Sequence, residues 1–182
     1  MPGRKGWALR AGVLVVSALV TGSVVLALGS RGDLEQADER VDTAWAQLRP
    51  GLDQRYLALG RAGDAARDRL GDDRALLTEL AGGLERWRDA DRQPVEVQAA
   101  AANRLEGFGA RLRAMVEATP RLRSAATVTG ALSDMEAADP VEARRGYNQA
   151  VDGYENVRDG FPRRLVAGAL GFDARRTLVV PA

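Results

Sequence analysis

Residues 41–70 read VDTAWAQLRPGLDQRYLALGRAGDAARDRL, and this stretch decides the fold class of the chain. Its apolar and small residues recur at spacings of three and four, which is the pattern of one buried stripe along a helix. Pro50 and Gly51 interrupt the pattern, so we expect a kink or a local break there. The stretch predicts a long first helix. The residues of its buried stripe are Val41, Trp45, Leu48, Leu52, Tyr56, Leu59, Gly63, Ala66 and Leu70.

Two further helices are predicted after this stretch. The second begins near Asp72 or Asp73, because either carboxylate can cap free backbone N–H groups. The third begins at Pro94, which suits a first helical position, and ends before Pro120. The inward residues of these two helices are predicted to be Leu76, Leu77, Leu80, Leu84 and Trp87, then Val97, Ala101, Leu105, Phe108, Leu112 and Met115.

The remaining residues predict either one bent fourth helix or two abutting helices, followed by a short amphipathic helix. Asp139 and Pro140 divide the apolar stripe of this region, which is why both arrangements stay open. The sequence therefore predicts an all-α fold, an antiparallel four-helix bundle over residues 34–174 with a tail over residues 175–182. The apolar residues of this region are Val128, Leu132, Met135, Tyr147, Val151, Tyr154, Val157, Leu165, Val166, Leu170 and Phe172.

Residues 11–30 form an uncharged, largely apolar stretch after a short basic tail over residues 1–10. Twenty such residues are enough to cross a bilayer core of about 30 Å as a helix. The stretch therefore predicts a transmembrane helix, with the lipid bilayer as its partner. A cleavable signal peptide and a buried core helix are the alternatives, although the stretch is longer than the roughly 7–15 apolar residues of a signal peptide.

The charges beside this stretch predict its orientation. Arg4, Lys5 and Arg10 lie on the short N-terminal side, whereas acidic residues dominate the first residues after Ser30. By the positive-inside bias, we expect a cytoplasmic N-terminus and an extracytoplasmic bundle at the cell membrane.

The composition excludes most catalytic chemistries. The chain contains no Cys and no His, which removes disulfides, Cys-based metal sites and the commonest general base. Lys5 is the one lysine and precedes the apolar stretch, so the bundle has no lysine for a Schiff base. Carboxylates alone can still bind a hard cation, but no loop organises them here. We therefore expect no enzyme activity, no cofactor and no metal.

The charge balance argues against nucleic acid as a partner. Three of the 26 basic residues and none of the 25 acidic residues precede residue 31, so residues 31–182 carry 23 basic and 25 acidic groups. A bundle of this near-neutral, mixed character lacks the concentrated basic face that neutralises phosphates.

Two stretches carry a more specific pattern. Residues 144–151 read RRGYNQAV, with Tyr154 next and Phe161-Pro162 after it. Residues 41–48 read VDTAWAQL, and Arg55-Tyr56 follow. These stretches resemble two patterns of the LemA family: the C-terminal signature, roughly RRxYNxAVxxYNxxIxxFP, and the first-helix pattern VxxAWxQ with a later RRYD.

The resemblance covers most of residues 34–172, with departures. Glu155 and Arg158 stand where the family signature has a second Asn and an Ile. The resemblance implies a short N-terminal tail, one membrane helix, an antiparallel bundle, no agreed enzymatic activity and a membrane-associated role. We predict that the matching residues form one functional face. The alternative is that the Tyr and Asn side chains satisfy one another's hydrogen-bonding groups inside the core. The residues of this predicted face are Arg55, Tyr56, Arg145, Tyr147, Asn148, Tyr154, Phe161 and Pro162.

These observations favour an interaction or scaffold module at the cell envelope that binds an unknown partner protein or a second copy of itself. The alternative is an extracytoplasmic sensor whose bundle binds a small ligand. Only about ten residues precede the apolar stretch, which leaves no cytoplasmic output domain for a sensor.

Overall fold

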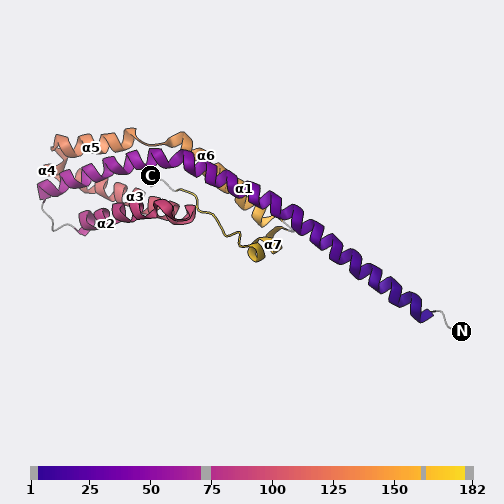
Figure 1. The fold of residues 1–182 in the computed structure, drawn as a ribbon. Helices are drawn as coiled ribbons and strands as arrows, with labels where there is room; N and C mark the ends of the chain where they lie inside the picture. The colour runs from indigo at the N-terminus through magenta and orange to yellow at the C-terminus, as the bar shows by residue number, and fades with distance from the viewer. Residues whose placement is uncertain (1–3, 71–74, 161–162, 179–182) are drawn as a thin grey trace. The chain divides into compact units, whose positions relative to one another are not determined.

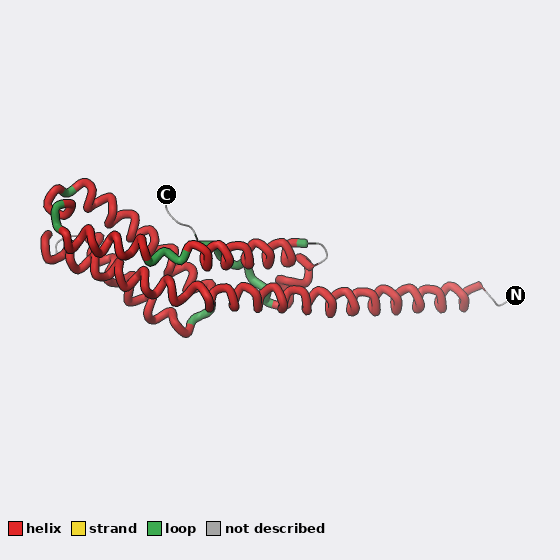
Figure 2. The backbone as a smooth tube through the Cα atoms, turned by 90° about the horizontal axis from the view of Figure 1, so that it is seen from above, coloured by secondary structure: helices red, strands yellow, loops and turns green. Residues whose placement is uncertain are grey.

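The structure is a computed structural model, and it describes residues 4–70, 75–160 and 163–178 (Figure 1). Side chains are described from Arg31 onward, except those of residues 163, 165, 166 and 169. Helices dominate the described residues, and the tube of Figure 2 contains no strand there. The elements in chain order are α1 (Arg4–Leu70), α2 (Ala75–Asp89), the 3₁₀ turn η1 (Ala90–Arg92), α3 (Val95–Ala118), α4 (Pro120–Arg123), α5 (Ala126–Ala137), α6 (Val141–Asp159) and α7 (Arg163–Leu170). The predicted all-α class and the helical bundle are confirmed.

The predicted fold class was wrong in its separate transmembrane helix over residues 11–30. In the part of the chain that the structure describes, no helix is long and apolar enough to cross a membrane. The apolar stretch forms no element of its own, because its backbone continues without a break into the 67-residue α1. The predicted orientation, with a cytoplasmic N-terminus and an extracytoplasmic bundle, depended on that separate helix and has no support in the structure. The membrane-associated role that the resemblance implies stays a prediction.

The chain divides into two compact units, one of residues 1–39 with 153–174 and one of residues 40–152 with 175–182. In the first unit, Leu34, Ala37, Tyr154 and Ala167 are buried. Helix α7 ends in this unit at Gly171, whose φ of 78° is the left-handed conformation that glycine adopts readily. The amide of Phe172 donates to the carbonyl of Ala167 and so closes the helix end.

The second unit contains the bundle, and its core confirms the stripe predicted for the first helix. From Val41 to Ala66 every residue of that stripe is buried. The predicted break at Pro50 is wrong, since α1 runs through this proline. The region after residue 125 forms two abutting helices, α5 and α6, which was one of the two open arrangements. The predicted capping residues Asp72 and Asp73 lie outside the described residues.

The buried face of α3 differs from the prediction. Val97 is 47% exposed, whereas Gln98 and Glu106 are buried. The apolar periodicity misplaced this face because two of its buried positions carry polar side chains that have partners inside the bundle. The buried residues of α3 are Gln98, Ala99, Ala102, Leu105, Glu106, Gly109, Leu112 and Val116.

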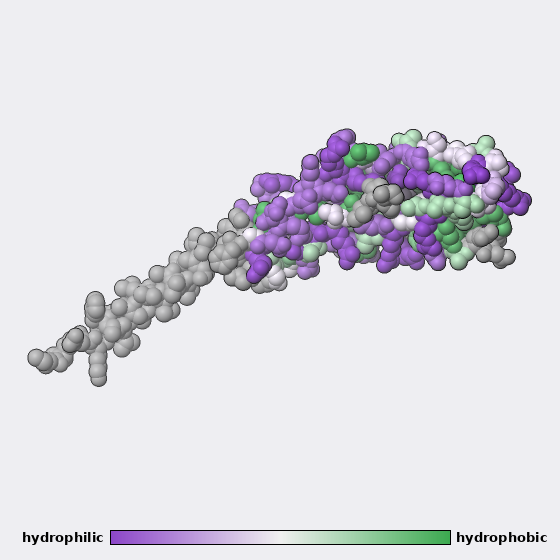
Figure 3. All heavy atoms as spheres, turned by 180° about the vertical axis from the view of Figure 1, so that it is seen from behind, coloured by the Kyte–Doolittle hydropathy of each residue, from purple (hydrophilic) through white to green (hydrophobic). Residues whose placement is uncertain are grey.

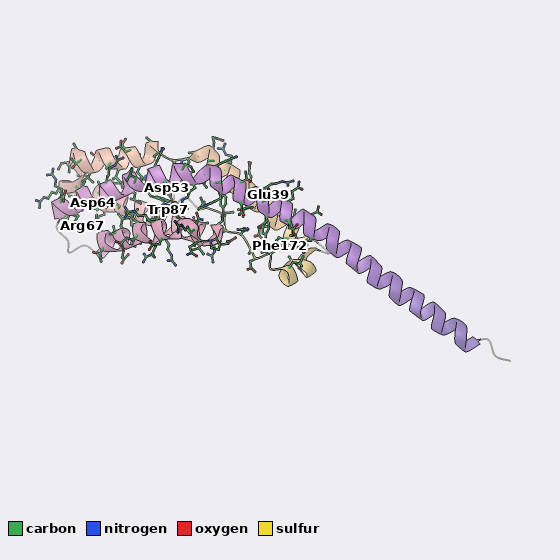
Figure 4. All side chains as sticks on the ribbon, in the orientation of Figure 1. Glu39, Asp53, Asp64, Arg67, Trp87 and Phe172 are labelled. Atoms are coloured by element: carbon green, nitrogen blue, oxygen red, sulfur yellow. The ribbon has the colours of Figure 1, made fainter. Side chains whose placement is uncertain are left out.

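Four aromatic rings fill the centre of this unit. The ring centroids of Trp45 and Tyr147 are 5.1 Å apart, those of Tyr56 and Trp87 are 5.0 Å apart, and those of the two tryptophans are 6.4 Å apart. All three pairs pack edge to face, the arrangement that ring quadrupoles favour. The indole N–H of Trp87 donates to Asp53 Oδ1 at 2.8 Å, and Figure 4 shows the two side chains beside each other on α2 and α1. The aromatic residues therefore join α1, α2 and α6.

Gly51 is required for close packing of α1. A Cβ atom at this position would lie 2.6 Å from Cβ of Pro140, and a proline ring cannot rotate away. We expect Gly51→Ala to lower the free energy of unfolding by about 1–3 kcal/mol, because overpacking offsets any gain in helix propensity. Gly107 is the matched control, since a Cβ there meets nothing within 4 Å. Gly107→Ala should stabilise the chain by about 1 kcal/mol in urea unfolding followed by circular dichroism. Equal effects of the two substitutions would contradict this packing argument.

Candidate functional site

A buried ion pair joins α1 to α3. The guanidinium of Arg55 donates from Nε and Nη2 to the carboxylate of Glu106, each at 2.9 Å, and both side chains are less than a tenth exposed. Arg55 Nη1 donates to the carbonyl of Met135 at 2.7 Å. The hydroxyl of Tyr56 lies 3.2 Å from both Glu106 Oε1 and the carbonyl of Ala102. Two neighbouring residues of the predicted face therefore lie inside the bundle.

A second arginine brings α6 to the same carboxylate. Arg144 Nη2 lies 3.5 Å from Glu106 Oε1 and 2.6 Å from Asp139 Oδ1. Arg144 Nη2 and Asp139 Oδ1 are buried and neither makes a hydrogen bond, so their attraction is electrostatic. We call Arg55, Glu106, Asp139 and Arg144 the buried ion network. It contains two positive and two negative charges, which limits the cost of removing each ion from water.

The network changes the acidity of its members. Burial lowers the pKa of Arg55, but the hydrogen bond and the charge of Glu106 outweigh it, and the pKa is raised above its ordinary value. Burial raises the pKa of Tyr56 well above its ordinary range, and the neighbouring Glu106 carboxylate raises it further. Both side chains therefore stay protonated at neutral pH and serve as hydrogen-bond donors.

Gln98 organises a second polar contact near the aromatic rings. Its side-chain oxygen accepts hydrogen bonds from Trp45 Nε1 at 2.8 Å and from Arg49, while its amide nitrogen donates to the carbonyl of Gln93 at 2.7 Å. The guanidinium of Arg49 lies 4.2 Å from the ring centroid of Trp87, within the range of a cation–π contact. Both polar groups of the Gln98 side chain therefore have hydrogen-bond partners, the oxygen on α1 and the amide nitrogen at Gln93.

The signature residues of α6 hold the C-terminal segment, which we define as residues 175–178. Asn148 donates from Nδ2 to the carbonyl of Leu178 at 3.0 Å and accepts from the amide of Leu178 at 2.9 Å. The hydroxyl of Tyr147 donates to the carbonyl of Arg176 at 2.8 Å, and Asn103 of α3 donates to that of Thr177 at 3.0 Å. All four contacts recognise backbone groups, so they do not depend on the side chains of the segment.

Arg175 adds an ionic contact to the same attachment. It pairs with Glu96 of α3 and lies 3.6 Å from Asp42 of α1. Burial raises the pKa of Tyr147 above its ordinary range, although the positive charge of Arg175 acts in the opposite direction. Tyr147 therefore remains a neutral donor to the segment.

The predicted functional face is not one exposed surface. Arg55, Tyr56 and Tyr147 are buried in the second unit, and Asn148 is half-buried. In the first unit, the hydroxyl of Tyr154 donates to the carbonyl of Asp173 at 2.7 Å. Arg145 is exposed and pairs with Glu142, while Phe161 and Pro162 lie outside the described residues. Sequence analysis missed Glu106, Gln98 and Asn103, because each is a polar residue with at least one partner that is distant along the chain.

The second unit also has several concave regions, and one of about 340 Å³ is lined by Asp53, Leu57 and Trp87 among others. A groove of about 780 Å³ lies between α2, η1, α3 and the C-terminal segment. A smaller cavity of about 130 Å³ lies beside Arg55, Glu106 and Asp139. Among the described residues, no three carboxylates are grouped to bind a metal ion. The residues that line the groove are Gly83, Arg86, Asp89, Ala90, Gln93, Glu96, Val97, Ala100, Ala101, Asn103, Arg104 and Arg176.

The buried ion network should be sensitive to loss of one charge. We expect Glu106→Gln to lower the free energy of unfolding by about 3–5 kcal/mol, because Arg55 and Arg144 would stay buried without their shared counter-ion. Glu79→Gln is the control, since the pair of Glu79 with Arg111 is more than half exposed and contributes at most about 1 kcal/mol. Urea unfolding of both variants measures the difference, and similar losses would contradict the role of the network.

The attachment of the C-terminal segment should depend on Asn148. We expect Asn148→Ala to speed hydrogen exchange at the amide of Leu178, because this amide loses its acceptor. Gln149→Ala changes the exposed neighbour on the same helix and should leave the exchange rate as it is. An unchanged rate in the Asn148 variant would show that other contacts hold the segment.

Comparison with known proteins agrees with the signature residues. The model of the LemA family matches residues 44–182, which is more than half of the chain. The match includes residues 144–151 and, of the first stretch, residues 44–48 with Arg55-Tyr56. No curated protein matches the chain. On the strength of the family match, this chain belongs to the LemA family.

Proposed function

We propose that this chain is a non-enzymatic interaction module that binds a partner protein in the groove between α2, η1, α3 and the C-terminal segment. The main observation in support of this proposal is the groove itself. With a volume of about 780 Å³, the groove has room for side chains of a partner protein. Its floor contains alanines and a glycine, and Val97 exposes nearly half of its surface there. Exposed apolar surface with a polar rim is typical of interaction sites.

The buried charges support a structural role over a catalytic one. Glu106 compensates Arg55 and Arg144 at once, and Asp139 also faces Arg144. The negative charge of Glu106 is needed inside the bundle, because Arg55 makes no other ion pair among the described residues. These acidic groups therefore stabilise the bundle and are unsuited to proton transfer.

The two smaller concave regions give less support to the small-ligand sensor. The cavity of about 130 Å³ is well below the volume of typical organic ligand sites, and the ion network lines it. In the region of about 340 Å³, the polar groups of Arg49 and Trp87 already contact Asp53. In Figure 3, hydrophilic residues cover much of the face that is shown, and hydrophobic residues occupy smaller areas of it.

Site-specific cross-linking in cells tests this proposal. A photoreactive amino acid at Val97, inside the groove, should give adducts of discrete mass, because a bound partner lies within reach of this side chain. Val141 of α6 is the matched control, since it is also a valine and is 51% exposed against 47% for Val97. The same residue placed at Val141 should give no such adducts.

A second substitution separates groove contact from random collision. Ala101→Trp adds a large side chain to the groove lining and should remove the Val97 adducts while the helical content is unchanged. Adducts that persist in this variant, or that form equally at Val141, would overturn the proposal.

A further inference from the structure

Three arginines from three different elements meet at the groove. Arg86 belongs to α2, Arg104 to α3 and Arg176 to the C-terminal segment. All three are exposed, and within the described ranges none of them makes an ion pair. This differs from Arg49, Arg111, Arg113 and Arg145 of the same unit, each of which has an acidic partner. The three guanidinium groups are therefore available to a ligand.

The acidic residues of the groove do not cancel these charges. Glu96 is already paired with Arg175, which leaves Asp89 against the three arginines. The groove therefore has an excess of positive charge, which attracts a negatively charged ligand. Arginine suits this task because its planar guanidinium donates two parallel hydrogen bonds to one carboxylate.

We infer that the occupant of the groove is an extended, acidic peptide segment of a partner protein, an inference that rests on the proposed function. Ala100 and Ala101, which are partly exposed in the lining, have small side chains that allow a peptide backbone to approach closely. Gln93 is exposed and provides a side-chain amide at the lining that can pair with backbone groups of the peptide. Carboxylates along the peptide meet Arg86, Arg104 and Arg176.

Nucleic acid fits the groove less well. Single-stranded nucleic acid binds where aromatic side chains stack on its bases, and the groove lining contains no aromatic residue. A duplex needs an extended basic face, whereas residues 31–182 carry slightly more acidic than basic groups. A local cluster of three arginines matches a few carboxylates better than a phosphate backbone.

The signature residues of α6 position one wall of the groove. Arg176 reaches the groove because Tyr147 and Asn148 hold the backbone of its segment on both sides, at residues 176 and 178. Asn148 does not line the groove, so it acts on the ligand through Arg176. The family signature thus contributes to binding as a set of positioning residues.

The test uses the purified full-length chain and a fluorescent peptide of alternating Glu and Ala, with a Gln and Ala peptide as the neutral comparison. Fluorescence anisotropy should show binding of the acidic peptide that weakens as salt is added. The double substitution R86E and R104E should lower the affinity at least about tenfold, because it replaces attraction with repulsion. R88E and R121E change the net charge equally at exposed positions outside the groove and should keep the affinity within about twofold.

Asn148→Ala should also weaken binding, although both groove arginines of α2 and α3 remain.

Three results would overturn the inference. The first is equal binding of the neutral peptide, and the second is equal loss of affinity in the R88E and R121E control. The third is tighter binding of a single-stranded oligonucleotide or of anionic phospholipid vesicles, with the same dependence on Arg86 and Arg104. If Val97 forms adducts in cells but the acidic peptide does not bind, the interaction module stands and its acidic occupant is wrong. If the peptide binds through the arginines but no adducts form, the groove chemistry is right and the cellular role is wrong.

Discussion

The carboxylate of Glu106 is the point on which the bundle depends. It accepts hydrogen bonds from Arg55 and Tyr56 of α1 and lies near Arg144 of α6. One buried negative charge on α3 therefore joins α1, α3 and α6. Each of these ions has lost several kcal/mol of hydration, which only close partners can offset. Apolar contacts are non-directional, but this network requires defined distances. It therefore fixes the rotation of α3 and the positions of α1 and α6, and the four aromatic rings pack within that frame.

Much of the fold could be predicted from the sequence, and the errors have physical causes. The stripe of α1 was predicted well, because nearly all of its buried positions are apolar or small. The face of α3 was misplaced, because Gln98 and Glu106 occupy core positions where periodicity expects apolar residues. Pro50 did not end α1, since packing along a long helix can outweigh the loss of one backbone hydrogen bond. Residues 11–30 matched a transmembrane pattern in composition, yet the backbone makes them the beginning of a longer helix.

The candidate site could be predicted only in part. The residue types of the signature pointed to Tyr147, Asn148 and Arg55, but their partners lie far away in the sequence. Asn148 binds a backbone 30 residues further on, and Arg55 pairs with a residue 51 positions away. No local pattern encodes such pairs, because they exist only after the helices have packed. The groove was not predicted either, since its arginines belong to three separate elements and look like ordinary surface charges in the sequence.

The C-terminal segment is attached through its main chain, and this has an evolutionary consequence. Asn148 hydrogen-bonds to both backbone groups of Leu178. Tyr147 and Asn103 donate to the backbone carbonyls of residues 176 and 177. These contacts are the same for any side chain that the segment carries at position 176. A single codon change there can reverse the charge of one groove wall without loosening the segment. Related chains can therefore differ in the charge of this groove wall while the packing of their helices is unchanged.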